Sequence, residues 1–220
     1  MTRAMSSRDT ILSRIRTALS GEPPVERPPV PEVWPPGNPS VEEMADRFAE
    51  ELQAVSGEIH RAATMEDARR RLAELLDELS CDLLGAIDRP ICRDVLSEIP
   101  SDHLAWPEAG GTARTMCELA AGLVPADALL ADTGSCLIAC GTPQERLLCY
   151  LPPVCIVIAR TDQLVEHLPA VWESIASRSA DPNLRGEFVL VTGPSRTADI
   201  EKILILGVHG PKRLIVLLVG

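Results

Sequence analysis

The residues best suited to bind a small ligand lie in a glycine-containing turn near the end of the chain. Gly193, Ser195, Arg196, Thr197 and Asp199 follow the apolar run 188–191, which predicts a strand that leads into a helix. The first N–H groups of a helix lack intrahelical partners and lie at the positive end of its dipole. Such a turn can bind an anion, and we expect this one at the carboxyl edge of a sheet, where open α/β folds bind ligands. Ser195 or Thr197 can equally cap the helix without any ligand.

A second polar turn separates two apolar runs in the middle of the chain. It contains Thr133, Gly134 and Ser135. These residues can form the facing wall of a pocket completed by the first turn. Alternatively, they only close a β-hairpin, for which small polar residues and glycine are well suited.

A third turn begins at His209 and Gly210, after a helix that we expect to end at Gly207. Gly210 and the proline after it can serve conformation alone, and His209 can cap the helix C-terminus. At 1.5 Å per residue the helix would be about 15 Å long, and it would separate His209 from Ser195 and Asp199. We therefore exclude a Ser–His–Asp triad, and the catalytic residue, if any, is unknown.

The charge balance limits the kinds of partner. With 21 basic and 32 acidic residues, the net charge is −11, which argues against binding to the phosphate backbone of a nucleic acid. Both lysines, Lys202 and Lys212, lie near Arg196 and Arg213, so the C-terminal region is locally basic. These charges can steer an anionic ligand, or they can be ordinary surface charge.

The seven cysteines do not have the spacing of a metal site. No CxxC pair is present, so the usual zinc and iron–sulfur patterns are missing. Cys136 and Cys140 fall on one face of an expected strand, roughly 13 Å apart, which is too far to share one metal without a bend. We expect buried free thiols, no metal site and no bound cofactor. Motifs for dinucleotides, P-loops, hydrolase elbows and zinc proteases are also absent.

The order of the elements predicts an α/β fold with an open, largely parallel sheet flanked by helices. Residues 1–39 form an N-terminal helix and a proline-rich strap, and residues 40–220 form the α/β domain. The helix carries an apolar stripe that must dock on this domain, a second subunit or a partner. We expect buried strands at 154–159, 188–191 and 214–219, a short helix at 119–123, a further strand at 147–151, and a helix at 164–177 with Trp172 facing inward.

The N-terminus and the apolar runs indicate a cytoplasmic protein. The first twenty residues are charged and lack the apolar region of a signal peptide. No apolar run reaches the roughly 18 residues of a membrane span.

Three segments resemble the LUD-domain family, in particular its lactate utilization protein C group. The most specific comprises Thr192–Glu201 followed by Gly207–Pro211. A second comprises residues 126–128 and 131–135, and a third comprises Arg146–Pro153. The resemblance leads us to expect His in many relatives where this chain has Cys155. If that His has a chemical role, this chain lacks it; if it is a packing residue, Cys can replace it, and in either case the resemblance does not imply a general catalytic role for this position.

The resemblance implies a NagB/RpiA/CoA-transferase-like fold and a part in the oxidation of L-lactate to pyruvate. It implies a non-redox accessory or regulatory component that works with iron–sulfur partner proteins, which alone carry the clusters. The turns above then provide a site for a small anion or a nucleotide-like ligand.

One alternative is an independent enzyme that acts on a phosphorylated metabolite or acyl-CoA, with Asp199 or Glu201 as its acid–base group. Another is an interaction module that binds a partner through residues 1–39. A homo-oligomer is also compatible with the sequence.

Overall fold

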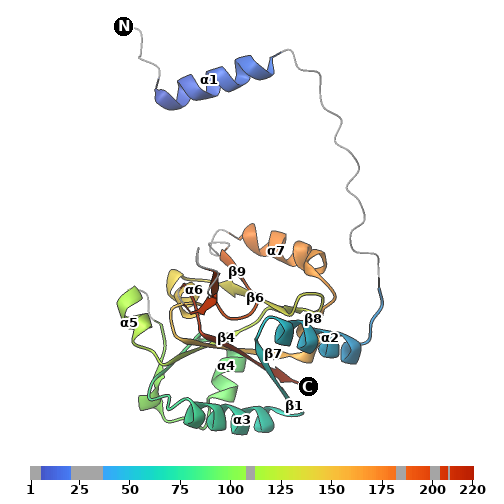
Figure 1. The fold of residues 1–220 in the computed structure, drawn as a ribbon, viewed down its shortest axis with the longest axis vertical. Coiled ribbons are helices and arrows are strands. Elements are labelled where there is room, and N and C mark those ends of the chain that lie inside the picture. The colour runs from blue at the N-terminus through green and yellow to red at the C-terminus, as the bar shows by residue number, and fades with distance from the viewer. Residues whose placement is uncertain (1–5, 21–36, 108–111, 182–186, 199–203, 208) are drawn as a thin grey trace. The chain divides into compact units, whose positions relative to one another are not determined.

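The computed structural model describes residues 6–20, 37–107, 112–181, 187–198, 204–207 and 209–220 (Figure 1). The chain divides into two units, residues 1–36 and 37–220. The described part of the first unit is helix α1 (Ser7–Leu19), which begins with a capping box between Ser6 and Asp9, as its sequence predicts. Ile11, Ile15 and Leu19 on its stripe are 58%, 49% and 64% exposed.

A six-stranded parallel sheet forms the centre of the second unit and confirms the predicted fold class. Its order is β1 (Glu58–Ala62), β12 (Arg213–Val219), β7 (Val154–Arg160), β4 (Ala121–Pro125), β2 (Leu84–Ala86) and β3 (Leu104–Ala105). The β7 and β12 runs are apolar throughout because both faces of these strands are buried. The strands predicted at 154–159 and 214–219 are therefore confirmed.

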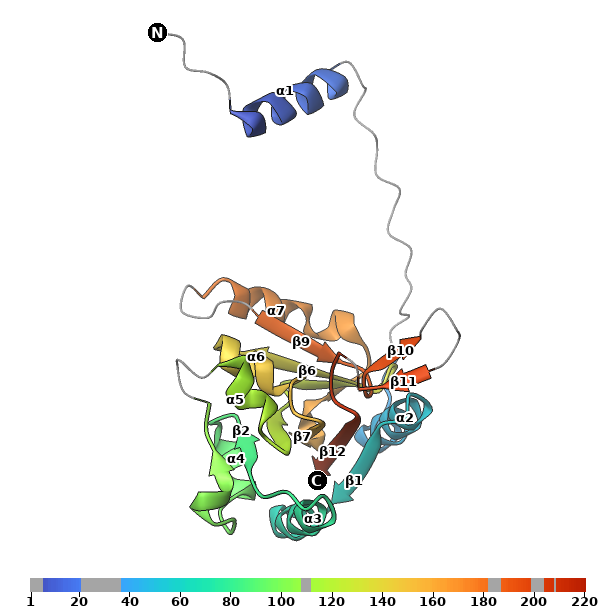
Figure 2. The same ribbon diagram turned by 60° about the vertical axis from the view of Figure 1, so that its left-hand side comes forward.

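Each face of this sheet packs against a different set of helices (Figures 1 and 2). One face packs on α3 (Met65–Glu78) and α4 (Pro90–Val95). The opposite face packs on α2 (Val41–Ala54), α5 (Ala113–Cys117) and α6 (Pro143–Leu148). Successive residues of β12 alternate between these two cores, as the period of a strand requires.

A second sheet of four strands completes the core on the α2 side. Its order is β8 (Leu164–Val165), β5 (Ala128–Leu130), β6 (Ser135–Cys140) and β9 (Glu187–Val191). Strand β6 runs antiparallel to both β5 and β9. Residues around α7 (Trp172–Ser179) pack on the outer face of this sheet. A separate hairpin joins β10 (Arg196–Ala198) to β11 (Leu204–Leu206), and short 3₁₀ turns occupy Ser101–His103, Thr161–Gln163 and Leu168–Val171.

Several predicted elements were wrong. The run 188–191 forms a strand, but β9 pairs antiparallel in the second sheet and is not buried, since Leu190 is 46% exposed. Residues 119–123 lead into strand β4, and most of 147–151 follows helix α6 rather than forming a strand. The stretch 164–177 contains β8 and a 3₁₀ turn before α7, and Trp172 is 54% exposed rather than buried. Short apolar runs fit a strand or a buried helix equally well, so their periodicity could not decide these cases.

The C-terminal turn of α2 packs tightly against two glycines from distant loops. Gly134 precedes β6 with φ +63°, and a Cβ there would lie 2.3 Å from the backbone nitrogen of Leu52. Gly193 follows β9 with φ +81°, and its Cβ would lie 2.9 Å from the carbonyl oxygen of Val55. Only glycine allows both the positive φ and the close backbone approach. The two loops are therefore fixed to the same helix end.

This packing predicts that Gly134→Ala destabilises the domain strongly. The new methyl group meets helix backbone, which cannot move aside cheaply, and positive φ adds about 1–2 kcal/mol of strain. We expect a loss of about 3 kcal/mol or more in the free energy of unfolding, measured by chemical denaturation.

Gly141→Ala is the matched control for this experiment. Its Cβ would make only ordinary contacts, at 3.6 Å or more, with the side chains of Arg89 and Glu145. We expect this variant to lower the free energy of unfolding by less than about 1 kcal/mol. Equal losses for the two variants would contradict the packing described for α2.

Candidate functional site

The C-terminal turn expected to begin a helix leads into the β10–β11 hairpin instead. Arg196 pairs with Leu206 in this antiparallel ladder, and Gly207 has φ +78°. Thr197 lies in β10, while Asp199 falls outside the described residues. The anion site therefore cannot be a helix N-terminus, and the helical interpretation of this segment was wrong. The run Ile203–Leu206 suits a strand as well as a helix, and the pairing with β10 decides between them.

The hairpin brings the C-terminal motif residues together. The Ser195 N–H donates to the Pro211 carbonyl at 2.9 Å, and the Gly207 N–H donates to the Ser195 carbonyl at 2.9 Å. Gly210 lies against the Ser195 side chain, since a Cβ on Gly210 would be 3.1 Å from that of Ser195. The Ser195 N–H is thus already bonded and is not available to a ligand. The side chain of Ser195 remains a candidate donor.

The second polar turn touches this region through a chain of hydroxyl groups. Ser135 is 1% exposed, and its Oγ lies 2.8 Å from Thr133 Oγ1 and 2.7 Å from Thr192 Oγ1. The turn around Gly134 also joins β5 to β6 as a hairpin. The two loops expected to face each other therefore lie in direct contact.

The positive groups of the region are exposed at its surface. Arg196, His209 and Lys212 are all exposed, and Arg196 Nη2 donates to Ser56 Oγ at 2.9 Å. Ser56 follows α2 with φ +67°. Among the described residues, no carboxylate forms an ion pair with Arg196 or Lys212. We call Thr133, Ser135, Ser195, Arg196, His209 and Lys212 the loop cluster.

The loop cluster lies at the edge of the parallel sheet opposite to the expected one. The N–H groups of Lys212 and Arg213 both donate to the Pro153 carbonyl, just before β12 and β7 begin. Ser56 likewise precedes β1. These are the amino ends of the strands, so the expectation of a carboxyl-edge site was wrong.

The separation expected between Ser195 and His209, on which the exclusion of a triad rested, was also wrong. It assumed a helix between Ser195 and His209, whereas the hairpin returns the chain to Ser195, next to Gly210. With Asp199 outside the described residues, the structure gives no geometry for an acidic third member, and no catalytic role is assigned to these residues.

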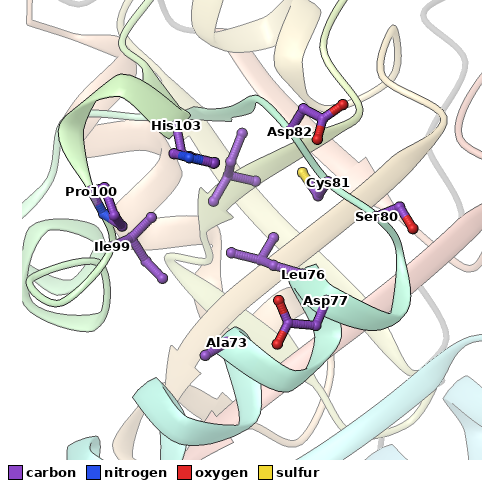
Figure 3. Close-up of a pocket in the computed structure, with 10 residues that line it drawn as sticks. Ala73, Leu76, Asp77, Ser80, Cys81, Asp82, Ile99, Pro100 and His103 are labelled. Carbon is purple, nitrogen blue, oxygen red and sulfur yellow. The ribbon is translucent and has the colours of Figure 1, made fainter.

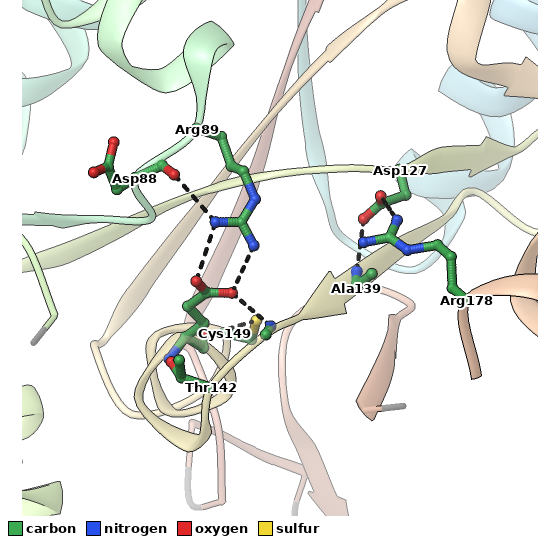
Figure 4. Close-up of polar contacts among 9 residues, drawn as sticks. Asp88, Arg89, Asp127, Ala139, Thr142, Cys149 and Arg178 are labelled. Carbon is green, nitrogen blue, oxygen red and sulfur yellow. Dashed lines mark hydrogen bonds and ion pairs between the residues drawn. The ribbon is translucent and has the colours of Figure 1, made fainter. Parts of the chain in front are cut away.

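The carboxyl edge of the sheet holds charged groups that the sequence did not single out (Figure 4). The connections between strands change direction across the sheet there, between the parallel strands β2 and β4, and open α/β folds bind ligands at such a point. Glu145 is buried at this edge, and Arg89 donates to its two oxygens at 3.1 and 3.0 Å. The Gly141 N–H adds a third bond at 2.7 Å. Because both Glu145 oxygens are occupied, the pair ties α6 to the loop after β2 and is poorly placed to act on a substrate.

Asp127, which follows β4, is held in the same way. It accepts the Ala139 N–H at 2.6 Å and pairs with Arg178. Asp127 falls in the second segment of the family resemblance, whereas no sequence motif indicated Arg89 or Arg178, because the ion pairs join segments far apart in the chain.

A cavity of about 460 Å³ opens near this edge of the sheet. A second cavity, of about 350 Å³, lies between α3 and the turn at His103 (Figure 3). No residue of the loop cluster lines either cavity.

The cysteines are free thiols, as predicted, and five of the seven are buried. Cys155 is fully buried in β7, and burial raises the pKa of its thiol to about 12. The thiol stays protonated at neutral pH and has a packing role.

The described residues contain no group of His, Cys, Asp or Glu side chains arranged to hold a metal. Every helix among them falls short of the length and apolarity that a membrane span requires.

Known proteins resemble this chain over shares of its length that range from 42% to 96%. The lactate utilization protein C of Deinococcus radiodurans is 26% identical over 215 residues, which cover 96% of this chain and 94% of that protein. The protein of the same name from Halalkalibacterium halodurans is 33% identical over 93 residues, and this chain spans only 40% of its length. The uncharacterized protein YkgG of Escherichia coli is 26% identical over 179 residues, 79% of this chain and 77% of that protein.

A solved structure and a family sequence model also match this chain. The crystal structure of a DUF162 family protein from Deinococcus radiodurans superposes with a TM-score of 0.61 at 19% identity, covering 83% of this chain and all of that one. The sequence model of the LUD domain matches residues 45–219, which include both sheets and the whole loop cluster. This chain belongs to the LUD domain family.

Proposed function

We propose that this protein acts in lactate utilization as a non-redox accessory component that binds a small anion at the loop cluster. The observation that carries the ligand site is the exposed Arg196 guanidinium. One of its nitrogens donates a hydrogen bond to the Ser56 hydroxyl, and Ser195 is the preceding residue in the chain. Arg196 and Lys212 have no carboxylate partner among the described residues, although the chain as a whole is acidic. A guanidinium with nearby hydroxyl groups suits a carboxylate or a phosphate.

The pathway rests on the family and on the names of the relatives. The Deinococcus radiodurans protein named lactate utilization protein C aligns with nearly the whole chain. We therefore propose L-lactate oxidation to pyruvate as the process, and iron–sulfur proteins as the partners that carry the electrons. The lack of CxxC spacing and the burial of most thiols support placing the clusters on those partners.

The alternative of an independent enzyme on a phosphorylated metabolite or acyl-CoA has less support. Its acid–base candidates, Asp199 and Glu201, lie outside the described residues. The buried carboxylate of Glu145 has both oxygens bonded within the protein. We therefore favour a binding role for the loop cluster.

Arg196→Gln tests the ligand site. L-lactate, pyruvate, inorganic phosphate and a nucleotide are each added while thermal unfolding is followed. An anion at about 100 times its Kd should stabilise the wild type by about 2.7 kcal/mol, and the variant should lose most of this effect. Arg114→Gln, at a highly exposed arginine of α5, should retain it. Stabilisation that survives unchanged in Arg196→Gln would place the ligand elsewhere.

Anaerobic co-purification tests the partners. A tagged full-length chain expressed from its own genome should retain proteins that carry iron–sulfur clusters, visible by their absorbance and iron content. Deletion of the gene should slow growth on L-lactate but not on glucose. Absence of cluster-bearing proteins from the purified material, with normal growth of the deletion strain on lactate, would refute the accessory role.

A further inference from the structure

A polar cavity of about 460 Å³ lies along β1, away from the loop cluster. Strand β1 is an edge strand, because it pairs only with β12. The cavity is lined by β1 itself and by the N-terminal half of α3; its charged and titratable lining residues are His60, Arg61, Asp67, Arg70, Arg71 and Glu74. Its volume falls within the range of small-molecule sites.

His60 presents an unused hydrogen-bond donor in this cavity. Arg71 Nε donates to His60 Nδ1 at 3.3 Å, and an arginine nitrogen can only donate. In the neutral ring Nδ1 is therefore the acceptor, and the proton lies on Nε2. Nε2 is buried and has no partner among the described residues. Burial, assisted by the charge of Arg71, lowers the pKa of His60, so the ring stays neutral at pH 7.

Arginine side chains line the same cavity as His60. Arg71 Nη1 bonds to Glu74 and Glu78 at 2.9 and 3.0 Å, whereas its Nη2 has no partner among the described residues. Arg70 uses a single nitrogen on Asp67. Each guanidinium carries five N–H donors, so the carboxylates leave donors free. An unpaired buried N–H is unfavourable, and a ligand that accepts its hydrogen bond would relieve this cost.

The edge of β1 is better suited to a small ligand than to an added strand. Arg61 projects from the middle of β1 and is held by Asp46 at 2.8 Å and Glu42 at 3.3 Å. A charged side chain fixed at a sheet edge discourages pairing with another strand. The cavity beside it remains open to solvent.

We propose that the cavity between β1 and α3 is a second ligand site, which binds a small oxyanion such as a phosphate or carboxylate. The Nε2–H of His60 bonds one oxygen, and free N–H groups of Arg71 and Arg70 bond the others. The site shares no residue with the loop cluster and does not depend on the function proposed for it.

Histidine NMR and calorimetric titration of the full chain test this site. Inorganic phosphate and acetate are added separately at pH 7, with sodium chloride at equal ionic strength as the reference. We expect the Nε2–H resonance of His60 to shift with saturation. We also expect His60→Phe and Arg71→Gln each to weaken binding about tenfold or more. Arg93→Gln removes a similar ion-paired arginine outside the cavity and should leave the saturation of the His60 resonance unchanged.

Two outcomes would overturn the proposal. One is a His60 resonance that responds to neither anion at concentrations up to about 10 mM, which would mean that only water meets the Nε2–H. The other is binding that Arg93→Gln weakens as much as Arg71→Gln does, which would mean diffuse attraction. A well-dispersed spectrum of each variant shows that it is folded, so loss of the fold is recognised separately.

Discussion

The close contact of Gly134 and Gly193 with the end of α2 is the constraint on which the loop cluster depends. Each glycine has positive φ and approaches helix backbone at a distance that no side chain would permit. Gly134 belongs to the second sheet, Gly193 leads from that sheet to β10, and α2 leads into β1. The contact thus joins the two sheets at one point. It brings the Ser135–Thr192 hydroxyl pair and the Arg196–Ser56 bond beside the amino ends of β1, β7 and β12.

The distribution of charge follows from the same architecture. At the carboxyl ends of β2 and β4, acidic and basic groups satisfy one another through Arg89 with Glu145 and Asp127 with Arg178. Such pairs connect elements and leave little capacity for a ligand. At the opposite edge, Arg196 and Lys212 lack such partners among the described residues. Ion pairs therefore brace the carboxyl edge between β2 and β4, while Arg196 and Lys212 carry positive charge without a carboxylate partner among the described residues at the opposite edge.

The sequence predicted the parts of the fold that local patterns determine. The apolar runs of β7 and β12, the cap at Ser6 and the hairpin around Gly134 all carry signals within a few residues. The β10–β11 hairpin and the antiparallel pairing of β9 depend on contacts between distant segments, so they could not be read from periodicity. The residues of the loop cluster were mostly identified from their types, whereas their location required the fold. Ser56 joined the region, and Glu145 and His60 became notable, only through long-range contacts.

The most direct measurement of the central claim is a crystal structure of the full chain grown with saturating L-lactate or inorganic phosphate. The account predicts density for the anion within hydrogen-bonding distance of the Arg196 guanidinium and the Ser195 hydroxyl, with α2 and both glycine loops in the positions described. A structure in which Arg196 and Ser195 are well defined, the anion is bound elsewhere and the loop cluster is empty would contradict it.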